Sequence, residues 1–383
     1  MDFTLTDEQQ AISELSHRIL SEQLPSERLR ELEVSGAWYA DDVWAALAKA
    51  DLLGIALPEA DGGGGYGLTE ACLIAEQVGR TVAPLPYLSC IIGAALPLAE
   101  FGTEGQRKEH LPGVIDGSRT LTSALYEPGD VDVPTVPTTQ ASPTDGGWRL
   151  DGEKSFVVGA DRAAVILVPA RVDDHTSTVF LVDPTAPGVS LDREVAVHGE
   201  AQWTVRLTGV VVGADQVLGQ PGQGADVVRW TVDRLTAAIC ATQTGVCEEA
   251  LAITARYVSE REQFGTKLGT FQAVGHRVAD AYIDTEAIRL TALQAIWRLE
   301  GGDGSQGTDA HDELMVAKFW AAEGGQRVVH AAQHLHGGIG VDLDYPIHRY
   351  FRWAKYLELT LGGASPSLRR LGASLTSQPV GTT

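Results

Sequence analysis

The sequence predicts an α+β chain of several domains: an N-terminal helical domain, a middle antiparallel β domain and a C-terminal four-helix bundle. Apolar residues recur at helical spacing from Thr6 to about Glu100. β-Branched residues, Pro, Gly and Asp then dominate as far as about Val217, and a helical period returns after a Gly-Gln-rich turn. We therefore expect domains at 1–120, 121–218 and 219–375, followed by a tail at 376–383.

The N-terminal region contains two local signals of helix boundaries. Thr6 is followed three residues later by Gln9, which is the spacing of a capping box. A second helix is expected from about Leu68 to Gly79, because its apolar residues fall on one face. The glycine-rich run at 61–67 lacks the Lys and the strand-to-helix setting of a nucleotide-binding loop, so we interpret it as a surface turn.

The two later regions differ in period. Apolar runs at 164–170 and 178–183 are typical of strands, and Gly-Asp and Asp-Gly pairs supply turns between them. The segment at 219–375 has few helix breakers and is long enough for a four-helix bundle with short connections. Such bundles pair readily, so an oligomer is expected.

Composition excludes several classes of function. The 383 residues carry a formal charge of -22, which opposes binding to nucleic acid. No apolar run reaches the length of a membrane-spanning helix, and the first residues lack the features of a signal peptide, so we expect a cytoplasmic protein. The four cysteines are scattered, without the spacing of a metal site, and buried thiols are the expectation.

Two segments stand out, and the first of them points to a charged ligand. In Arg261-Glu-Gln-Phe-Gly-Thr-Lys-Leu-Gly-Thr-Phe-Gln272 a helix is interrupted at Phe-Gly, where a guanidinium and free backbone N–H groups can hold a diphosphate. Taken alone, Arg261 would be better explained as an exposed residue on a polar helix face. The second segment, at 333–340, reads Gln-His-Leu-His-Gly-Gly-Ile-Gly, and its glycines let the backbone approach a ligand or cap a helix.

The order and separation of these segments resemble those of acyl-CoA dehydrogenases, and the resemblance covers nearly the whole chain. It implies FAD as the cofactor, with its pyrophosphate and adenosine surrounded by Arg261, Gln263, Phe264, Leu268, Gln272, Gln333, Gly337 and Gly338. In that family these residues serve an FAD that is held mainly by the neighbouring subunit. The resemblance therefore implies at least a dimer.

The flavin-facing segments depart from the family pattern. Family members usually carry Thr-Glu-Pro-Gly-x-Gly-Ser-Asp and Trp-x-Thr stretches beside the isoalloxazine ring. The matching runs here are at 126–133, Tyr-Glu-Pro-Gly-Asp-Val-Asp-Val, and at 156–158, Phe-Val-Val. Phe156 can still stack on a ring, but Val158 lacks the hydroxyl that a Thr would offer near the reactive flavin nitrogen. The flavin side of the site is expected to be weakened.

The usual catalytic carboxylate is also missing. The family base is a Glu just before a Gly-Thr pair, and Leu361 stands at that position. Glu358 lies about one turn earlier. A minority of the family places the base before an Arg-Leu pair, which makes Asp233 a candidate base and Arg234 a candidate contact for the acyl-CoA substrate. Asp233 is explained at least as well by pairing with a basic neighbour or by capping its helix.

A chain that keeps the residues around the adenosine of FAD but lacks the catalytic base resembles one subunit of the heteromeric acyl-CoA dehydrogenases of actinobacterial steroid side-chain breakdown. These are α2β2 assemblies with one complete site per α/β pair, and the runs at 319–328, 336–342 and 348–351 resemble their base-lacking chain. The implied partners are a homologous subunit, an acyl-CoA and an electron-transferring flavoprotein. Two alternatives stay open: a homo-oligomeric enzyme that uses Asp233, and a non-catalytic scaffold that kept the fold.

Overall fold

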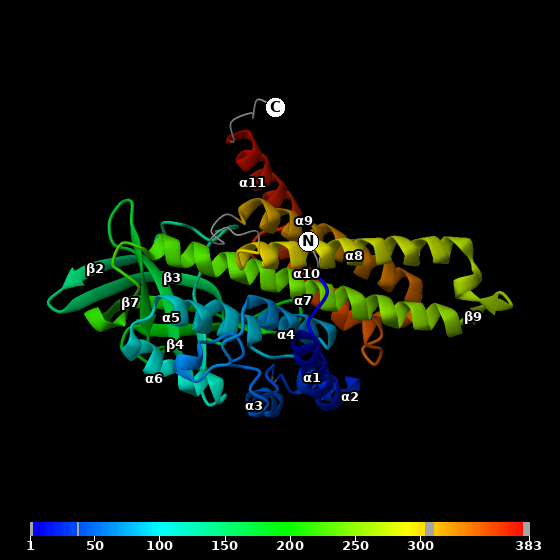
Figure 1. The fold of residues 1–383 in the computed structure, drawn as a ribbon, viewed down its shortest axis with the longest axis horizontal. Helices are drawn as coiled ribbons and strands as arrows, with labels where there is room; N and C mark the ends of the chain where they lie inside the picture. The colour runs from blue at the N-terminus through cyan, green and yellow to red at the C-terminus, as the bar shows by residue number, and fades with distance from the viewer. Residues whose placement is uncertain (1–2, 37, 303–309, 378–383) are drawn as a thin grey trace. The chain divides into compact units, whose positions relative to one another are not determined.

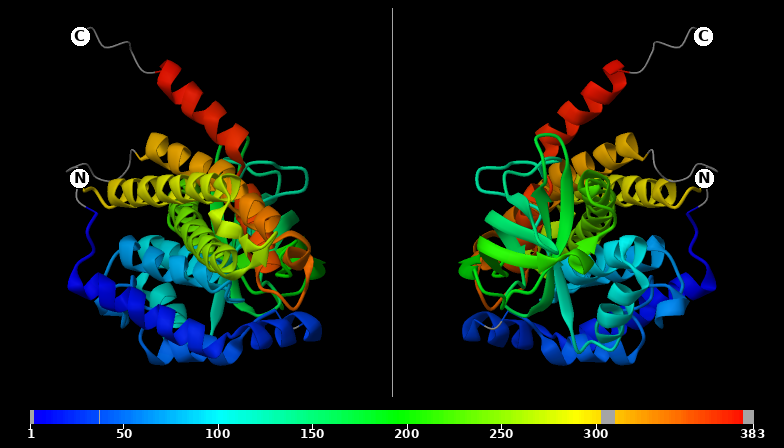
Figure 2. Two further views of the ribbon diagram at one scale, coloured as in Figure 1. Left: turned by 90° about the vertical axis from the view of Figure 1, so that its right-hand side faces the viewer. Right: turned by 90° about the vertical axis from the view of Figure 1, so that its left-hand side faces the viewer.

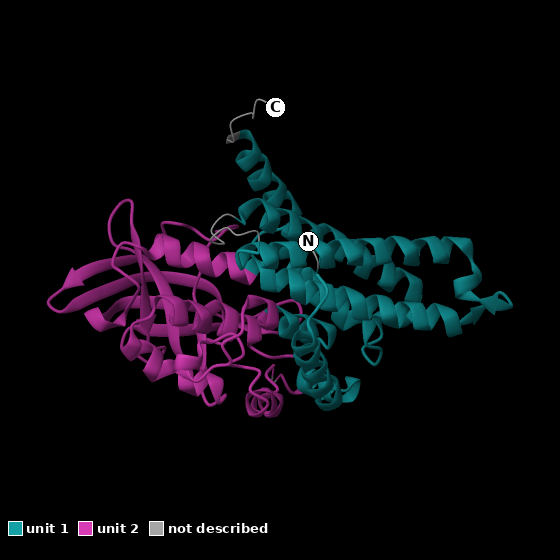
Figure 3. Ribbon diagram, viewed as in Figure 1, with its two compact units in different colours: residues 1–34, 72–83, 236–383 teal, residues 35–71, 84–235 magenta. Residues whose placement is uncertain are grey.

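The computed structural model describes residues 3–36, 38–302 and 310–377 (Figure 1, Figure 2). The chain divides into two compact units, each assembled from stretches that are far apart in the sequence (Figure 3). Unit 1 contains residues 1–34, 72–83 and 236–383, and unit 2 contains residues 35–71 and 84–235.

Unit 2 is built around an eight-stranded sheet with the order β6-β7-β3-β2-β4-β5-β8 and with β1 paired to β4. The strands are β1 (Thr120–Ser123), β2 (Gln140–Thr144), β3 (Gly147–Val158), β4 (Ala163–Arg171), β5 (Ser177–Val182), β6 (Val189–Val195), β7 (Ala201–Gly213) and β8 (Val217–Leu218). The apolar runs expected as strands are confirmed as β4 and β5. Their alternate side chains, among them Ile166, Val168 and Phe180, are fully buried in the core of the sheet.

The sheet is antiparallel at most of its pairings, as expected, but β1 runs parallel to β4 over four residue pairs. A single pair, Gln140 with Arg171, also joins β2 to β4 in parallel. A strand joined by a tight turn must run antiparallel to its neighbour, whereas β1 and β4 are separated by the β2–β3 hairpin. Their direction was therefore not fixed by any local turn signal.

The helices of unit 2 include a segment with π-helical hydrogen bonding. They are α3 (Asp41–Lys49), η1 (Glu59–Asp61), η2 (Leu88–Ala95), α5 (Leu96–Phe101), α6 (Glu104–Ile115) and η3 (Ala214–Gln216), and η2 is the π-helix. Its Cys90 Sγ accepts a hydrogen bond from the Leu121 N–H of β1 at 3.3 Å. All four cysteines are buried thiols, as the sequence predicted.

The remaining helices are α1 (Asp7–Gln23), α2 (Ser26–Ser35), α4 (Leu68–Arg80), α7 (Gly224–Glu260), η4 (Leu268–Thr270), α8 (Gln272–Leu299), α9 (His311–His336), η5 (Gly337–Val341), α10 (Ile347–Leu359) and α11 (Ala364–Ser377). The capping box of Thr6 and Gln9 is confirmed at the start of α1, and the second predicted helix is confirmed as α4. α11 includes the first two residues of the expected tail, and 378–383 lie outside the described residues.

Two glycines let the parts of α4 and α7 in unit 1 pack at backbone distance. A Cβ on Gly79 would lie 2.0 Å from the Thr242 carbonyl oxygen, and a Cβ on Gly245 would lie 1.9 Å from the Glu76 carbonyl oxygen. Any side chain at either position would separate the helices. This packing fixes α7, whose C-terminal end leads into the first candidate ligand segment.

Candidate functional site

The chain interruption predicted at Phe264-Gly265 is confirmed as a hairpin between two long helices. α7 ends at Glu260, and β9 (Glu262–Gln263) pairs with β10 (Thr266–Lys267) before α8 begins. Phe264 and Gly265 both have positive φ, +57° and +78°, which closes the turn. The Leu268 N–H donates to the Arg261 carbonyl at 2.8 Å, so the hairpin is fixed at its base.

The hairpin presents side chains that are available to a ligand. The Arg261 guanidinium is exposed and makes no hydrogen bond or ion pair with another described residue. Phe264 is 92% exposed, with Phe271 edge-on to it at 6.3 Å between ring centroids. Gln263 is exposed and Leu268 half-buried. A free guanidinium beside exposed aromatic surface fits a diphosphate joined to a nucleoside.

The second segment ends α9 in a turn that requires glycine. Gly337 has φ +62° and ψ −137°, a conformation that is essentially restricted to glycine. A Cβ at Gly337 or at Gly338 would meet nothing within 4 Å, so the backbone here lies open. Gln333 behaves differently, because its Nε2 would lie 2.7 Å from a Cβ on Gly340 and its Oε1 is buried without a hydrogen bond. The Gln333 amide thus lies against the turn that contains Gly340, and its Oε1 accepts no hydrogen bond from a described residue.

An aromatic cluster joins the two segments. The Tyr257 ring, one turn before Arg261 on α7, stacks on His336 at 4.5 Å, and its hydroxyl donates to the His336 carbonyl at 3.5 Å. His336 Nδ1 lies 2.8 Å from the Ala332 carbonyl and must donate there, so Nε2 accepts from the Tyr345 hydroxyl at 3.2 Å. Burial lowers the pKa of His336, which favours this neutral form. His336 is thus a hydrogen-bonded residue at the end of α9.

Tyr257 was not predicted from the sequence to be part of this arrangement. Its position four residues before Arg261 was the available signal, since a helix that continued to Arg261 would bring both side chains to one side. Arg349 braces α10 against α2, because its guanidinium pairs with Glu33 through two contacts of 3.0 and 3.1 Å and donates to the Ser26 hydroxyl at 2.9 Å. Pro346 stands at the N-cap of α10.

In unit 2, the stretch that matches the flavin-facing segment is braced by a buried ion pair. The Glu127 carboxylate accepts from Lys154 Nζ at 2.8 Å, from the Thr138 hydroxyl at 2.7 Å and from the Thr139 N–H at 2.8 Å. Burial alone would raise the pKa of Glu127, but the ammonium and the threonine donors outweigh it and lower the pKa to about 2. Glu127 is thus a structural anion rather than a base.

Phe156 lies at an irregularity in β3, where the register with β7 shifts between Lys154 and Val157. Its φ is +56° and its side chain is 50% exposed, which is unusual for an aromatic residue in a strand. The Tyr126 ring stands edge-on to it at 6.1 Å. A bulge re-aims a side chain, and here it turns Phe156 outward from the sheet.

The two candidate base positions have different surroundings. Asp233 is half-buried on α7, and the neighbouring Arg234 guanidinium stacks on the Trp230 ring at 3.6 Å. Leu361 is buried and has φ +57°, which is strained for a branched side chain. The Glu358 carboxylate is bound by Lys355 at 2.5 Å, so it is not free to act as a base.

The segment that carries Leu361 is held by a buried lysine. Lys318 Nζ of α9 donates to the Leu357 carbonyl at 2.7 Å and to the Glu358 carbonyl at 3.2 Å, capping the end of α10. Burial lowers the pKa of Lys318 to about 8. Across the described residues, no group of His, Cys, Asp and Glu could hold a metal ion. None of the described helices is long and apolar enough to cross a bilayer.

Three family models match the chain: the N-terminal domain of acyl-CoA dehydrogenase over residues 6–118, its middle domain over 124–210 and its C-terminal domain over 222–374. The acyl-CoA dehydrogenase FadE27 of Mycobacterium tuberculosis is 38% identical over 99% of this chain and 100% of its own length.

Solved structures are also similar over nearly the whole chain. A variant of the Tcur3481-Tcur3483 steroid ACAD is 46% identical with a TM-score of 0.89, covering 97% of this chain and 99% of that one. The ChsE4-ChsE5 complex from Mycobacterium tuberculosis is 37% identical with a TM-score of 0.92, covering 99% of this chain and 100% of that one. The predicted fold class is confirmed by this similarity.

Proposed function

The chain belongs to the acyl-CoA dehydrogenase family of FAD-dependent oxidoreductases acting on CH–CH bonds, and on that premise we propose that it is one subunit of a heteromeric enzyme. In this proposal it contributes the grip on the adenosine and pyrophosphate of an FAD whose ring is housed by a homologous partner subunit. The observation that carries the proposal is the buried Leu361 at the position of the family base, in a chain whose Arg261 guanidinium is exposed and pairs with no residue that the structure describes.

The residues of the grip fit their role by charge and shape. The Arg261 guanidinium supplies paired donors for a diphosphate, and Gln263 and Gln272 are exposed amides close to it in sequence. The open backbone at Gly337 and Gly338 admits a nucleoside at van der Waals distance, which a side chain would prevent. The list of proposed cofactor contacts is completed by Phe264, Leu268 and Gln333.

The chemistry divides between the two chains. When bound, FAD supplies the acceptor for the hydride that leaves the β carbon of the acyl thioester. The α proton leaves to a carboxylate, and in our proposal the partner subunit provides that carboxylate. This chain positions the cofactor from its adenosine end, so its contribution is to affinity and orientation.

The relatives support a proposal for the substrate class. Because two similar structures are a steroid ACAD and a two-chain complex, we propose an acyl-CoA with a steroid side chain, with reoxidation by an electron-transferring flavoprotein. In the same proposal Arg234 lies near the acyl-CoA, and Phe156 is the remaining ring contact on the β domain.

A second candidate is a homo-oligomeric enzyme in which Asp233 is the base, favoured by its place just before Arg234 on α7. A third is a scaffold without catalysis. Purification of the chain alone and together with a homologous chain from the same gene cluster separates the three. We expect stoichiometric FAD and acyl-CoA oxidation only in the mixed complex, with one FAD for each pair of chains.

If the lone chain binds FAD stoichiometrically and oxidises acyl-CoA, the heteromeric proposal fails. A mixed complex without flavin or activity would favour the scaffold. The cofactor grip is tested separately by Arg261→Ala in the mixed complex, with Arg256→Ala as the control one turn earlier on α7. Loss of one charge-assisted contact is expected to weaken FAD binding by about 10- to 100-fold, or roughly 1.5–3 kcal/mol.

A further inference from the structure

Unit 1 contains a small cavity where α1, α2, α4, α7 and α10 meet. Its volume is about 250 Å³, the space of roughly eight water molecules, which suits only a small ligand. The described residues that line it include none of the proposed FAD contacts. We call it the Arg80 cavity, after the α4 residue that lines it together with His17, Leu24, Leu29, Val82 and Glu249.

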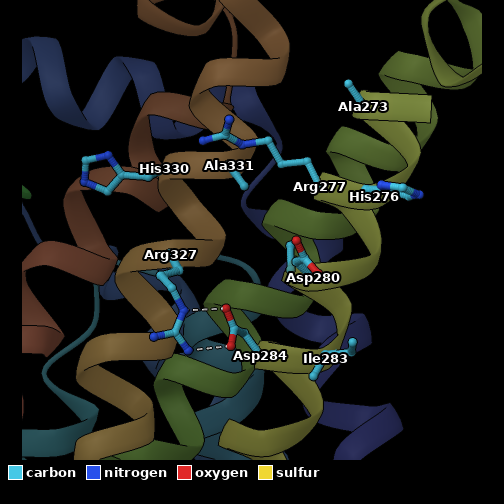
Figure 4. Close-up of a pocket in the computed structure, with 10 residues that line it drawn as sticks. Ala273, His276, Arg277, Asp280, Ile283, Asp284, Arg327, His330 and Ala331 are labelled. Atoms are coloured by element: carbon cyan, nitrogen blue, oxygen red, sulfur yellow. Dashed lines mark hydrogen bonds and ion pairs between the residues drawn. The ribbon is translucent and has the colours of Figure 1, made fainter. Parts of the chain in front are cut away.

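Two other arginines of unit 1 bind their carboxylates through pairs of hydrogen bonds. Between α8 and α9, the Arg327 guanidinium donates to both oxygens of Asp284 at 2.8 and 2.5 Å (Figure 4). In the wall of the Arg80 cavity, the buried Arg349 donates to both oxygens of Glu33 at 3.0 and 3.1 Å and to the Ser26 hydroxyl at 2.9 Å. Such hydrogen bonds compensate a charged group for the water that it loses on burial.

Arg80 and Glu249 face each other in the cavity without such a hydrogen bond. Arg80 Nε lies 3.5 Å from Glu249 Oε2, and this buried nitrogen has no hydrogen-bond partner among the described residues. Arg80 Nη1 lies 3.6 Å from Glu248, and the other cation near Glu249 is Arg256 at 4.0 Å. The side chains of Arg80 and Glu249 are 36% and 24% exposed, so water reaches them incompletely. A ligand that hydrogen-bonds to both would recover free energy that these groups lose on folding.

Two further features of the lining favour a carboxylate. His17 Nδ1 on α1 is buried and has no hydrogen-bond partner among the residues that the structure describes. α2 begins at Ser26, and the Leu29 N–H donates to the Pro25 carbonyl at 3.1 Å. The N–H groups before Leu29 have no partner inside the helix, so the positive end of the α2 dipole borders the cavity.

The rest of the wall is largely apolar. Leu24, Leu29 and Val82 are buried, and Pro346 lies beside them in the lining. Val82 has φ +44°, a left-handed conformation that is strained for a β-branched residue. The chain therefore holds an apolar side chain in this wall, two residues after Arg80, at a conformational cost.

We propose that the Arg80 cavity binds a small aliphatic α-amino acid. The ligand carboxylate accepts hydrogen bonds from Arg80 Nε and His17, the ligand ammonium donates to Glu249, and the aliphatic side chain lies against the apolar wall. A simple anion would lie beside the Glu249 carboxylate without a cation of its own, and a simple amine would meet Arg80 in the same way. The site goes beyond the proposed dehydrogenase function and does not depend on the shared FAD.

Three ligands of matched shape test the chemistry. L-Valine carries both charged groups, isovalerate lacks the ammonium and isobutylamine lacks the carboxylate. In isothermal titration calorimetry of the full chain, L-valine should bind at least about tenfold more tightly than either analogue, because each analogue loses a charge-assisted contact. The comparison needs no variant. Absence of saturable L-valine binding, or equal affinity for one of the analogues, would overturn the proposal.

Two variants test the location. Glu249→Gln should lose the preference for L-valine over isovalerate, and Arg80→Gln should lose the preference over isobutylamine. A purely structural role would not remove one preference and keep the other. Arg256→Gln, at a 65% exposed side chain, is the control and should keep the affinities of the parent chain. Circular dichroism checks that each variant folds, and parent-like preferences in both folded variants would contradict the Arg80 cavity as the site.

Competition separates this site from the dehydrogenase site. L-Valine should bind the lone chain and the mixed complex with equal affinity, and Arg261→Ala should leave that affinity unchanged. Saturating FAD or acyl-CoA should not displace L-valine. Displacement by either would show that the amino acid occupies the dehydrogenase site and would reject the Arg80 cavity, whereas failure of the shared-FAD proposal would leave L-valine binding intact.

Discussion

Glu127 is the residue whose charge state is most firmly set by its surroundings. It is buried with Lys154, and its pKa is lowered to about 2 by the ammonium and the threonine donors. In the folded chain it therefore binds fewer protons than in the unfolded chain between about pH 4.5 and pH 2. Its contribution to stability is present above that window and is lost as the pH falls through it.

Glu127→Gln should lower the free energy of unfolding by about 3–5 kcal/mol at neutral pH, because it leaves Lys154 buried without a counter-ion. It should also flatten the loss of stability in acid. Urea unfolding across the acid range measures both effects. Glu104→Gln, at a 71% exposed side chain, is the control and should behave as the parent chain does. Parent-like stability of Glu127→Gln would show that the pair is not needed.

Asp233 is the residue on which the two catalytic proposals differ. If the partner supplies the base, Asp233→Ala in the mixed complex should keep turnover within about twofold of the parent, since general base catalysis is worth roughly 100- to 10,000-fold. Asp226→Ala, an exposed position at the start of the same helix, controls for effects on α7. A fall in turnover of about 100-fold with Asp233→Ala alone would assign the base to this chain.

At the scale of elements, the turn after α9 has a conformational requirement at Gly337 and, in our proposal, a steric requirement at Gly338. Gly337 has a positive φ that favours glycine, whereas Gly338 does not have a positive φ. A Cβ added at either position would have no other atom within 4 Å. The two glycines therefore separate backbone strain from ligand contact.

Gly337→Ala should lower the free energy of unfolding by about 1–3 kcal/mol through strain, with or without cofactor. Gly338→Ala should leave stability unchanged but weaken FAD binding in the mixed complex roughly tenfold, or about 1.4 kcal/mol, because a Cβ enters the space of the nucleoside. Thermal unfolding and flavin titration measure the two quantities. Undiminished FAD affinity in Gly338→Ala would place the cofactor elsewhere.

At the scale of the whole molecule, we expect the stability of the protein to depend on whether the partner subunit and FAD are present. FAD binds the folded state of the mixed complex, so FAD at about 100 times its dissociation constant should add roughly 2.7 kcal/mol to the stability of that complex. The lone chain should gain nothing at the same FAD concentration. Scanning calorimetry of both samples with added flavin measures the difference, and an equal gain in the lone chain would argue for a self-contained site.

Local signals in the sequence gave correct elements where the interaction is local. Thr6 and Gln9 cap α1 because both partners lie within one turn. Phe264 and Gly265 close a hairpin because positive φ is a property of those positions and their neighbours. Contacts between distant segments were not predictable in this way. The parallel pairing of β1 with β4, the stack of Tyr257 on His336 and the inward amide of Gln333 each depend on residues far apart in the chain.

By itself, the sequence determined the helical, β and helical composition, the two glycine-containing turns and the absence of a Glu at position 361. These follow from residue type and short-range spacing. Only the tertiary structure decided that Glu358 is already bound by Lys355. It also decided that none of the residues at 3–36, 38–302 and 310–377 pairs with the side chains of Arg261, Arg277 or Asp280. The physical reason is that the pairing and the exposure of a side chain depend on which residues from distant parts of the chain lie next to it. Those neighbours are fixed by tertiary packing and not by the local sequence.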